Sequence, residues 1–96
     1  MEQIVCWRDE KGIAQCNIKE AALHYSPNGS NWSEEGSGRA IFAKNVLALY
    51  VDHTKADQYF EDFVKDFIDP MPESGGKILK SEILKWLRTK GEEIED

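Results

Sequence analysis

Residues 56–68 read Ala-Asp-Gln-Tyr-Phe-Glu-Asp-Phe-Val-Lys-Asp-Phe-Ile, and the fold is best predicted by starting from this stretch. At about 100° per residue, the apolar side chains fall on one stripe of a helix and the polar side chains on the opposite face. The apolar stripe comprises Ala56, Phe60, Phe63, Val64 and Phe67, and the polar face comprises Gln58, Glu61, Asp62, Lys65 and Asp66. The stretch therefore predicts an amphipathic helix, with Thr54 as its N-cap residue.

The segment before this helix, residues 39–51, is apolar almost all round, and only Arg39, Lys44 and Asn45 interrupt it. A helix without a polar face belongs in the centre of a fold. A buried strand is the alternative, but the alanines and the length of the segment favour a helix.

The segment after the amphipathic helix contains Pro70 and Pro72, which stop a helix because residues before proline avoid the α region. A final helix is predicted up to Lys90, beginning near Lys77 or capped by Ser81. Its inner stripe comprises Leu79, Ile83, Trp86 and Leu87.

The N-terminal residues 3–8 and 13–18 are two short β-prone runs, and Gly12 lies where a hairpin loop needs a positive φ. We expect a β-hairpin that brings Cys6 near Cys16, with a disulfide possible but not required. Asn17 and Glu20 have the spacing of a capping box, which predicts a short helix over residues 18–25 in competition with a longer second strand.

Residues 26–38 form a long loop rich in Ser and Gly, with Trp32 at its centre. The tryptophan either folds back onto the core or contacts a partner. The predicted fold is a single α+β, mainly α, domain over residues 1–96. It is a small three- to four-helix bundle with an N-terminal β-hairpin (1–18), the long loop (26–38), a helical core (39–91) and an acidic tail (92–96).

The chain carries a net charge of −6, and the charge is distributed unevenly. Residues 52–76 contain seven acidic and two basic side chains, whereas residues 77–91 contain five basic side chains and one acidic one. Asp62, Asp66 and Asp69 are spaced to project from one side of the amphipathic helix. This row is either a solvated face, partly neutralised by Lys77, Lys80, Lys85 and Arg88, or a docking surface for a basic partner.

No catalytic residue, metal or cofactor is predicted. Cys6, Cys16, His24 and His53 do not have the spacing of a zinc site or of a nucleophile with its base. Residues 1–20 lack the basic and apolar regions of a signal peptide, and no apolar run is long enough to span a bilayer. We therefore expect a cytoplasmic protein with two free thiols.

Residues 76–87 resemble the second half of an EF-hand, with Gly76, Ile78 and Glu82 at matching positions. Two of the three acidic ligands are missing, so calcium binding is not expected. The same stretch is similar to a helix of a winged-helix domain, such as those attached to viral primases. This similarity implies nucleic-acid contacts through Lys77, Lys85 and Arg88.

The sequence favours a non-enzymatic protein–protein interaction protein that presents an acidic surface to a basic partner. The predicted partner-binding residues are Glu61, Asp62, Asp66, Asp69, Glu73 and Trp32. A concrete version is a small viral or mobile-element inhibitor that mimics nucleic acid and occupies the basic groove of a nucleic-acid-binding enzyme. The alternative is the winged-helix-like nucleic-acid-associated module, although the acidity of the chain argues against direct nucleic-acid binding. A homodimer through the apolar 39–51 helix is also possible.

Overall fold

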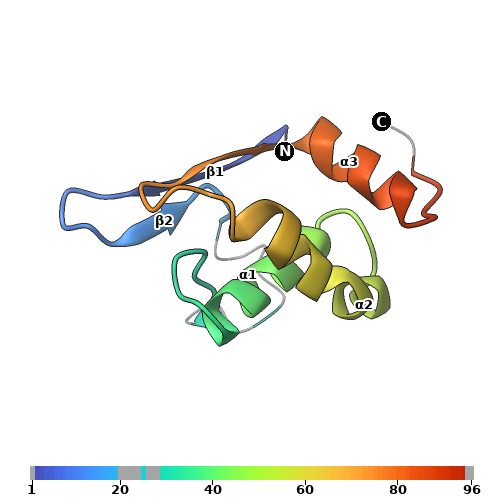
Figure 1. The fold of residues 1–96 in the computed structure, drawn as a ribbon, viewed down its shortest axis with the longest axis horizontal. Coiled ribbons are helices and arrows are strands. Elements are labelled where there is room, and N and C mark those ends of the chain that lie inside the picture. The colour runs from blue at the N-terminus through green and yellow to red at the C-terminus, as the bar shows by residue number, and fades with distance from the viewer. Residues whose placement is uncertain (1, 20–24, 26–28, 95–96) are drawn as a thin grey trace.

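A computed structural model describes residues 2–19, 25 and 29–94, which form an α+β fold (Figure 1). Seven elements follow one another along these residues. They are β1 (Gln3–Arg8), β2 (Ala14–Cys16), α1 (Ser37–Leu47), α2 (His53–Phe63), η3 (Val64–Ile68), β3 (Gly76–Leu79) and α3 (Lys80–Thr89).

The predicted hairpin is confirmed, and it belongs to a three-stranded antiparallel sheet with the order β2-β1-β3. Cys6 pairs with Cys16 across the hairpin, and Ile4 pairs with Ile78 of β3. Gly12 has a φ of 80°, and its N–H donates to the carbonyl of Asp9, which closes the turn. The hairpin extends away from the helices (Figure 1) and contributes to the long axis of a molecule measuring 41 × 23 × 22 Å.

The prediction that a helix begins near Lys77 is wrong, because residues 76–79 are the strand β3. Gly75 makes this strand possible: its φ is 104°, and its backbone passes close to Cys6 and Trp7 on β1. Leu79, which we expected on the inner stripe of the helix, is 44% exposed on the strand. The bundle of three or four helices is therefore replaced by three helices and a sheet in the described part of the chain.

Both central helices are present where the sequence predicts them, but their ends differ from the prediction by two to five residues. α1 ends at Leu47 instead of Val51, and α2 begins at His53 with Asp52, not Thr54, as its N-cap. The Asp52 carboxylate accepts a hydrogen bond from the Lys55 N–H at 2.9 Å, which satisfies a free donor of the first turn. The chain of α2 continues directly into the π-helical turn η3.

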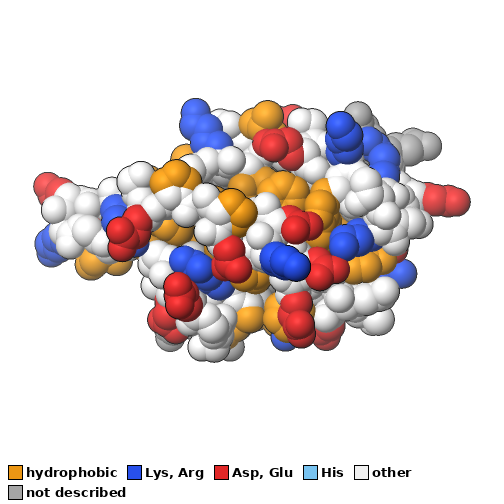
Figure 2. Space-filling model, in the orientation of Figure 1, with side chains coloured by type: hydrophobic (Ala, Val, Ile, Leu, Met, Phe, Trp, Pro, Cys, Tyr) orange, Lys and Arg blue, Asp and Glu red, His pale blue; other side chains and the backbone are white. Residues whose placement is uncertain are grey.

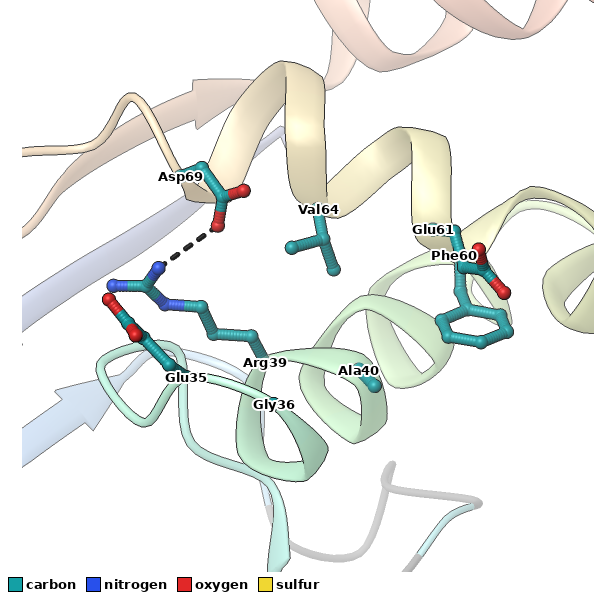
Figure 3. Close-up of a pocket in the computed structure, with 8 residues that line it drawn as sticks. All are labelled: Glu35, Gly36, Arg39, Ala40, Phe60, Glu61, Val64 and Asp69. Atoms are coloured by element: carbon teal, nitrogen blue, oxygen red, sulfur yellow. Dashed lines mark hydrogen bonds and ion pairs between the residues drawn. The ribbon is translucent and has the colours of Figure 1, made fainter.

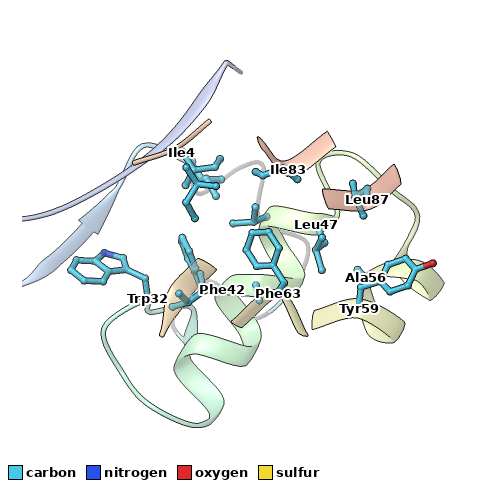
Figure 4. Close-up of a cluster of buried hydrophobic side chains, with 14 of the residues drawn as sticks. Ile4, Trp32, Phe42, Leu47, Ala56, Tyr59, Phe63, Ile83 and Leu87 are labelled. Carbon is cyan, nitrogen blue, oxygen red and sulfur yellow. The ribbon is translucent and has the colours of Figure 1, made fainter. Parts of the chain in front are cut away.

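The hydrophobic core lies between the inner face of the sheet and the three helices (Figure 4). α3 lies on the opposite side of this core from α1 and α2. Its residues Ile83 and Leu87 face Leu47 (Figure 4). Trp32 takes the first of its two predicted roles: it is only 4% exposed, and its Nε1–H donates to the carbonyl of Gln15 at 2.9 Å. The loop indole therefore joins the core to β2.

The side chain of Asn17 is hydrogen-bonded to the backbone of β1. The Asn17 Oδ1 accepts from the Val5 N–H, and its Nδ2 donates to the Gln3 carbonyl, both at 2.9 Å, so the side chain extends the pairing of β1 and β2. Most of the short helix predicted over residues 18–25 lies outside the described residues. In the described part of the chain, no helix has the length and apolar character needed to cross a membrane.

Candidate interaction site

The row of carboxylates on α2 and η3 is largely engaged by other groups of the same chain. Asp62 accepts a 2.8 Å hydrogen bond from the Lys90 ammonium. Asp66 accepts from the Trp86 Nε1–H at 2.8 Å. Asp69 forms a 2.9 Å ion pair with Arg39 of α1. The structure therefore supports the interpretation of a partly neutralised face: Asp62 and Asp69 are paired with cations, whereas Asp66 is hydrogen-bonded to a neutral indole.

The residues that neutralise the row are not those expected from the sequence. Lys77 lies on β3, and Lys80 is drawn toward Glu2, with 3.9 Å between their charged atoms. Instead, the neutralising cations are Lys90, just beyond α3, and Arg39, in the first turn of α1. Figure 2 shows Lys and Arg side chains interspersed with Asp and Glu on the visible face, not a continuous acidic strip.

Glu61 and Glu73 are the predicted partner-binding residues whose carboxylates have no polar partner within the described part of the chain. Both residues are exposed. Trp32, by contrast, is buried and does not contribute to an exposed partner surface. Of these two glutamates, only Glu61 belongs to the place described next, which also includes Asp69 of the row.

That place is a pocket of about 560 Å³ between the start of α1 and the junction of α2 with η3, here called the α1–α2 pocket (Figure 3). It is lined by Glu35, Gly36, Arg39, Ala40, Phe60, Glu61, Val64 and Asp69. Glu35 lies in the turn that precedes α1, and Glu61 lies on α2 on the other side of the pocket (Figure 3).

Arg39 fixes the inner end of the α1–α2 pocket. Its Nε–H donates to the Trp32 carbonyl at 3.0 Å, and its Nη1 contacts Asp69. The Arg39 side chain is only 20% exposed, so its guanidinium is contacted mainly by protein groups and not by water. The guanidinium therefore connects the long loop, α1 and η3.

The π-helical turn shapes the facing wall of the pocket. The Asp69 N–H donates to the Val64 carbonyl at 2.8 Å, which is the i→i+5 bond of a π-helix. Val64 and Asp69 both line the pocket. The wider turn therefore sets the position of the carboxylate that receives Arg39.

Electrostatically, the α1–α2 pocket has three carboxylates and one guanidinium. The guanidinium of Arg39 is paired with Asp69, whereas Glu35 and Glu61 have no ion pair among the described residues. Between them lie the apolar surfaces of Ala40, Phe60 and Val64. One face of the Phe60 ring already holds Lys44, whose ammonium lies 4.5 Å from the ring centroid. This combination of carboxylates and apolar surface suits the binding of a cation.

A second pocket of about 410 Å³ adjoins the first, since Glu35 and Arg39 line both. Its charges are balanced, with Arg8 and Arg39 against Glu35 and Glu73. The Arg8 guanidinium lies over the Trp32 ring, 5.3 Å from its centroid, and donates to the Glu73 carbonyl at 2.6 Å. Of these two pockets, the α1–α2 pocket is therefore the one with an excess of negative charge.

The three basic residues proposed for nucleic-acid contact do not line one side of a helix. Lys77 is on β3, whereas Lys85 and Arg88 are on α3. The Arg88 Nε–H donates to the carbonyl of Ile94. The strand at residues 76–79 thus removes the helical alignment on which that proposal was based.

The start of the tail is anchored by Glu92. Its carboxylate accepts from the Tyr59 hydroxyl at 2.7 Å and pairs with Lys55 at 3.1 Å. These hydrogen bonds lower the pKa of Glu92, and the hydrogen bond from Lys90 lowers the pKa of Asp62. Both groups therefore stabilise the fold as carboxylates.

Two residues of the site, Glu35 and Arg39, were not predicted from the sequence. Glu35 lies inside the predicted loop 26–38, although an acidic residue just before a helix start can be positioned by that start. Arg39 interrupts the predicted apolar helix, and an isolated arginine in such a helix is a signal for a carboxylate or carbonyl partner.

Comparison of the chain with curated proteins and with solved structures gave no significant match. A family model does match: that of a family of unknown function, DUF6166, aligns with residues 2–89. These residues include both pockets, the sheet and all three helices described above, and the chain therefore belongs to the DUF6166 family.

Proposed function

We propose that this protein is a non-enzymatic interaction protein that binds a basic segment of a partner protein in the α1–α2 pocket. The observation that carries the proposal is the pair of carboxylates, Glu35 and Glu61, which have no ion pair among the described residues and lie on either side of an apolar surface. Glu61 is one of the partner-binding residues predicted from the sequence. Glu35 was not among them, and the fold brings it to the same pocket.

The chemistry of the pocket favours a lysine or arginine side chain as its occupant. Such side chains bury an aliphatic stem on apolar surface while their charged end contacts carboxylates. Ala40 and Val64 offer that surface, and Glu35 and Glu61 offer the charge. A small anion or a nucleic-acid phosphate would instead be repelled by the pocket's excess of carboxylates.

The geometry favours a short basic segment over a broad basic groove of a nucleic-acid-binding enzyme. An extended mimic of nucleic acid needs a regular row of free negative charges, and Asp62, Asp66 and Asp69 are each engaged within the chain. A pocket with two free carboxylates suits one or two basic side chains flanked by apolar residues.

The test begins with a random-sequence peptide library displayed on phage and selected on the whole protein. We expect enrichment of peptides in which Lys or Arg lies beside apolar residues. The enriched sequence is then synthesised with a fluorescent label, and its Kd is measured by fluorescence anisotropy. Enriched peptides without basic residues would contradict the proposal.

The decisive variant combines Glu35→Gln with Glu61→Gln, and it should weaken peptide binding by about tenfold or more. Glu10→Gln with Glu93→Gln is the matched control. It removes the same charge from exposed positions outside the pocket lining, and we expect it to change the Kd by less than about twofold because distant exposed charges are screened. Equal weakening by both pairs would indicate attraction by net charge alone and would overturn the assignment to this pocket.

A further inference from the structure

The two cysteines of the chain lie directly opposite one another in the hairpin. The register of β1 and β2 pairs Cys6 with Cys16. Both thiols are free; Cys6 is buried in the core, and Cys16 is partly buried against it. Residues paired across a strand point to the same face of the sheet, so the two sulfur atoms share one side of the hairpin.

The hydrogen-bond pattern identifies the type of pair. The Asn17 N–H donates to the Val5 carbonyl, and the Asp9 N–H donates to the Ile13 carbonyl. Hydrogen-bonded positions alternate along an antiparallel ladder, so the pair of Cys6 and Cys16 is a non-hydrogen-bonded one. The Cα atoms of such pairs lie about 4.5 Å apart, which falls within the range of about 4.4–6.8 Å found in disulfides.

We propose that Cys6 and Cys16 are a two-thiol modification site that closes to a cross-strand disulfide by exchange with a low-molecular-weight disulfide such as oxidised glutathione. The Cys16 thiolate attacks one sulfur of that reagent and releases one molecule of thiol. The Cys6 thiolate then attacks the Cys16 sulfur of the mixed disulfide and releases the second. Two protein thiols lose two electrons and two protons, and one small disulfide becomes two thiols.

The order of these steps follows from burial. Cys6 is only 3% exposed, whereas Cys16 is partly accessible and is therefore the sulfur that meets the reagent first. Burial and the neighbouring Cys16 raise the pKa of Cys6 to about 12, and burial also raises the pKa of Cys16. Few thiolates exist at neutral pH, so the exchange is slow, and the site responds to a sustained change of redox conditions.

Closure of this disulfide has a structural consequence next to the core. Gln15, the neighbour of Cys16, accepts the Trp32 Nε1–H, and Arg8 of β1 covers the Trp32 ring. A covalent link between the strands therefore holds both contacts of the indole in place. This inference is independent of the α1–α2 pocket, since neither cysteine lines it.

The test is incubation of the folded protein in glutathione buffers of increasing oxidation, followed by acid quenching, alkylation and intact-mass analysis. We expect both thiols to disappear together with the loss of two hydrogens, and the oxidised form to unfold at a Tm several degrees higher because the closed loop restricts the unfolded chain. The same chain unfolded in urea is the control, because it shows whether each buffer oxidises the two thiols when they are fully accessible.

Two single variants separate the roles of the sulfur atoms. Cys6→Ser should stop at a mixed disulfide of Cys16 with glutathione, and Cys16→Ser should leave Cys6 unmodified. The proposal is overturned if the folded wild-type protein keeps both thiols in a buffer that oxidises the unfolded chain. It is equally overturned if the wild-type protein accumulates only the mixed disulfide.

Discussion

Arg39 in the first turn of α1 and Asp69 at the end of η3 form a 2.9 Å ion pair across the base of the α1–α2 pocket. The pair joins segments thirty positions apart in the chain. Its two members differ in exposure: the Arg39 side chain is 20% exposed and the Asp69 side chain 52%. The Arg39 side chain is therefore largely enclosed by the protein, whereas the Asp69 carboxylate remains about half exposed to solvent.

Replacing Arg39 by methionine should destabilise the fold by about 1–3 kcal/mol, because the Trp32 carbonyl loses a charge-assisted hydrogen bond. Asp69→Asn leaves that bond intact and should cost less than about 1 kcal/mol, as expected for a half-exposed ion pair. Urea unfolding followed by tryptophan fluorescence gives both values. An equal loss in the two variants would show that the ion pair, not the bond to the loop, carries the stability.

Gly75→Ala should be severely destabilising, because an added Cβ would overlap the carbonyl of Cys6 on β1. Gly91→Ala is the matched control, since Gly91 also has a positive φ, 92°, but no atom within 4 Å of the added Cβ. We expect the control to lose about 1 kcal/mol from backbone strain alone and Gly75→Ala to lose clearly more. Similar Tm values for the two variants would contradict the close approach of β3 to β1.

Asn45 is the one fully buried polar side chain among the described residues, and it acts as a clamp on the backbone. Its Oδ1 accepts from the Tyr25 N–H at 2.8 Å, and its Nδ2 donates to the Tyr25 carbonyl at 3.0 Å. Asn45→Leu preserves the volume but leaves both backbone groups unpaired, which should cost about 2 kcal/mol or more. Chemical denaturation checks the value, and a variant as stable as wild type would contradict the clamp.

The lowered pKa values of Asp62 and Glu92 predict an acid-sensitive fold. A carboxyl group whose pKa is lower when folded stabilises the protein above its unfolded pKa, and this contribution is lost as pH falls. We expect the Tm to fall between about pH 5 and pH 2. The variant Glu92→Gln should show a shallower fall, whereas Glu93→Gln should follow wild type. Parallel curves for all three proteins would exclude this contribution from Glu92.

The periodic segments of the sequence predicted their own structures well. The stripe of Phe60, Phe63 and Phe67 required a helix, and α2 with η3 covers it. The β-prone runs around Gly12 required a hairpin, and the hairpin formed with Cys6 opposite Cys16. In each case the information is local, because turn chemistry and helical periodicity act over a few residues.

The errors occurred where distant segments meet. Leu79 fits the apolar stripe of a helix as well as it fits a strand, and only pairing with β1, some seventy residues earlier, selects the strand. The N-cap of α2 was a separate, local error, because Asp ranks above Thr among N-cap residues and Asp52 is the cap.

The sequence by itself determined the α+β composition, the hairpin, the two central helices and the location of the acidic residues. Only the tertiary structure decided which of those acids are free. Asp62, Asp66 and Asp69 meet Lys90, Trp86 and Arg39 because α3 and α1 pack beside α2 and η3. Packing also brings Glu35 and Glu61 to one pocket with no ion pair to another described residue, because charge pairing depends on separation in space and not along the chain.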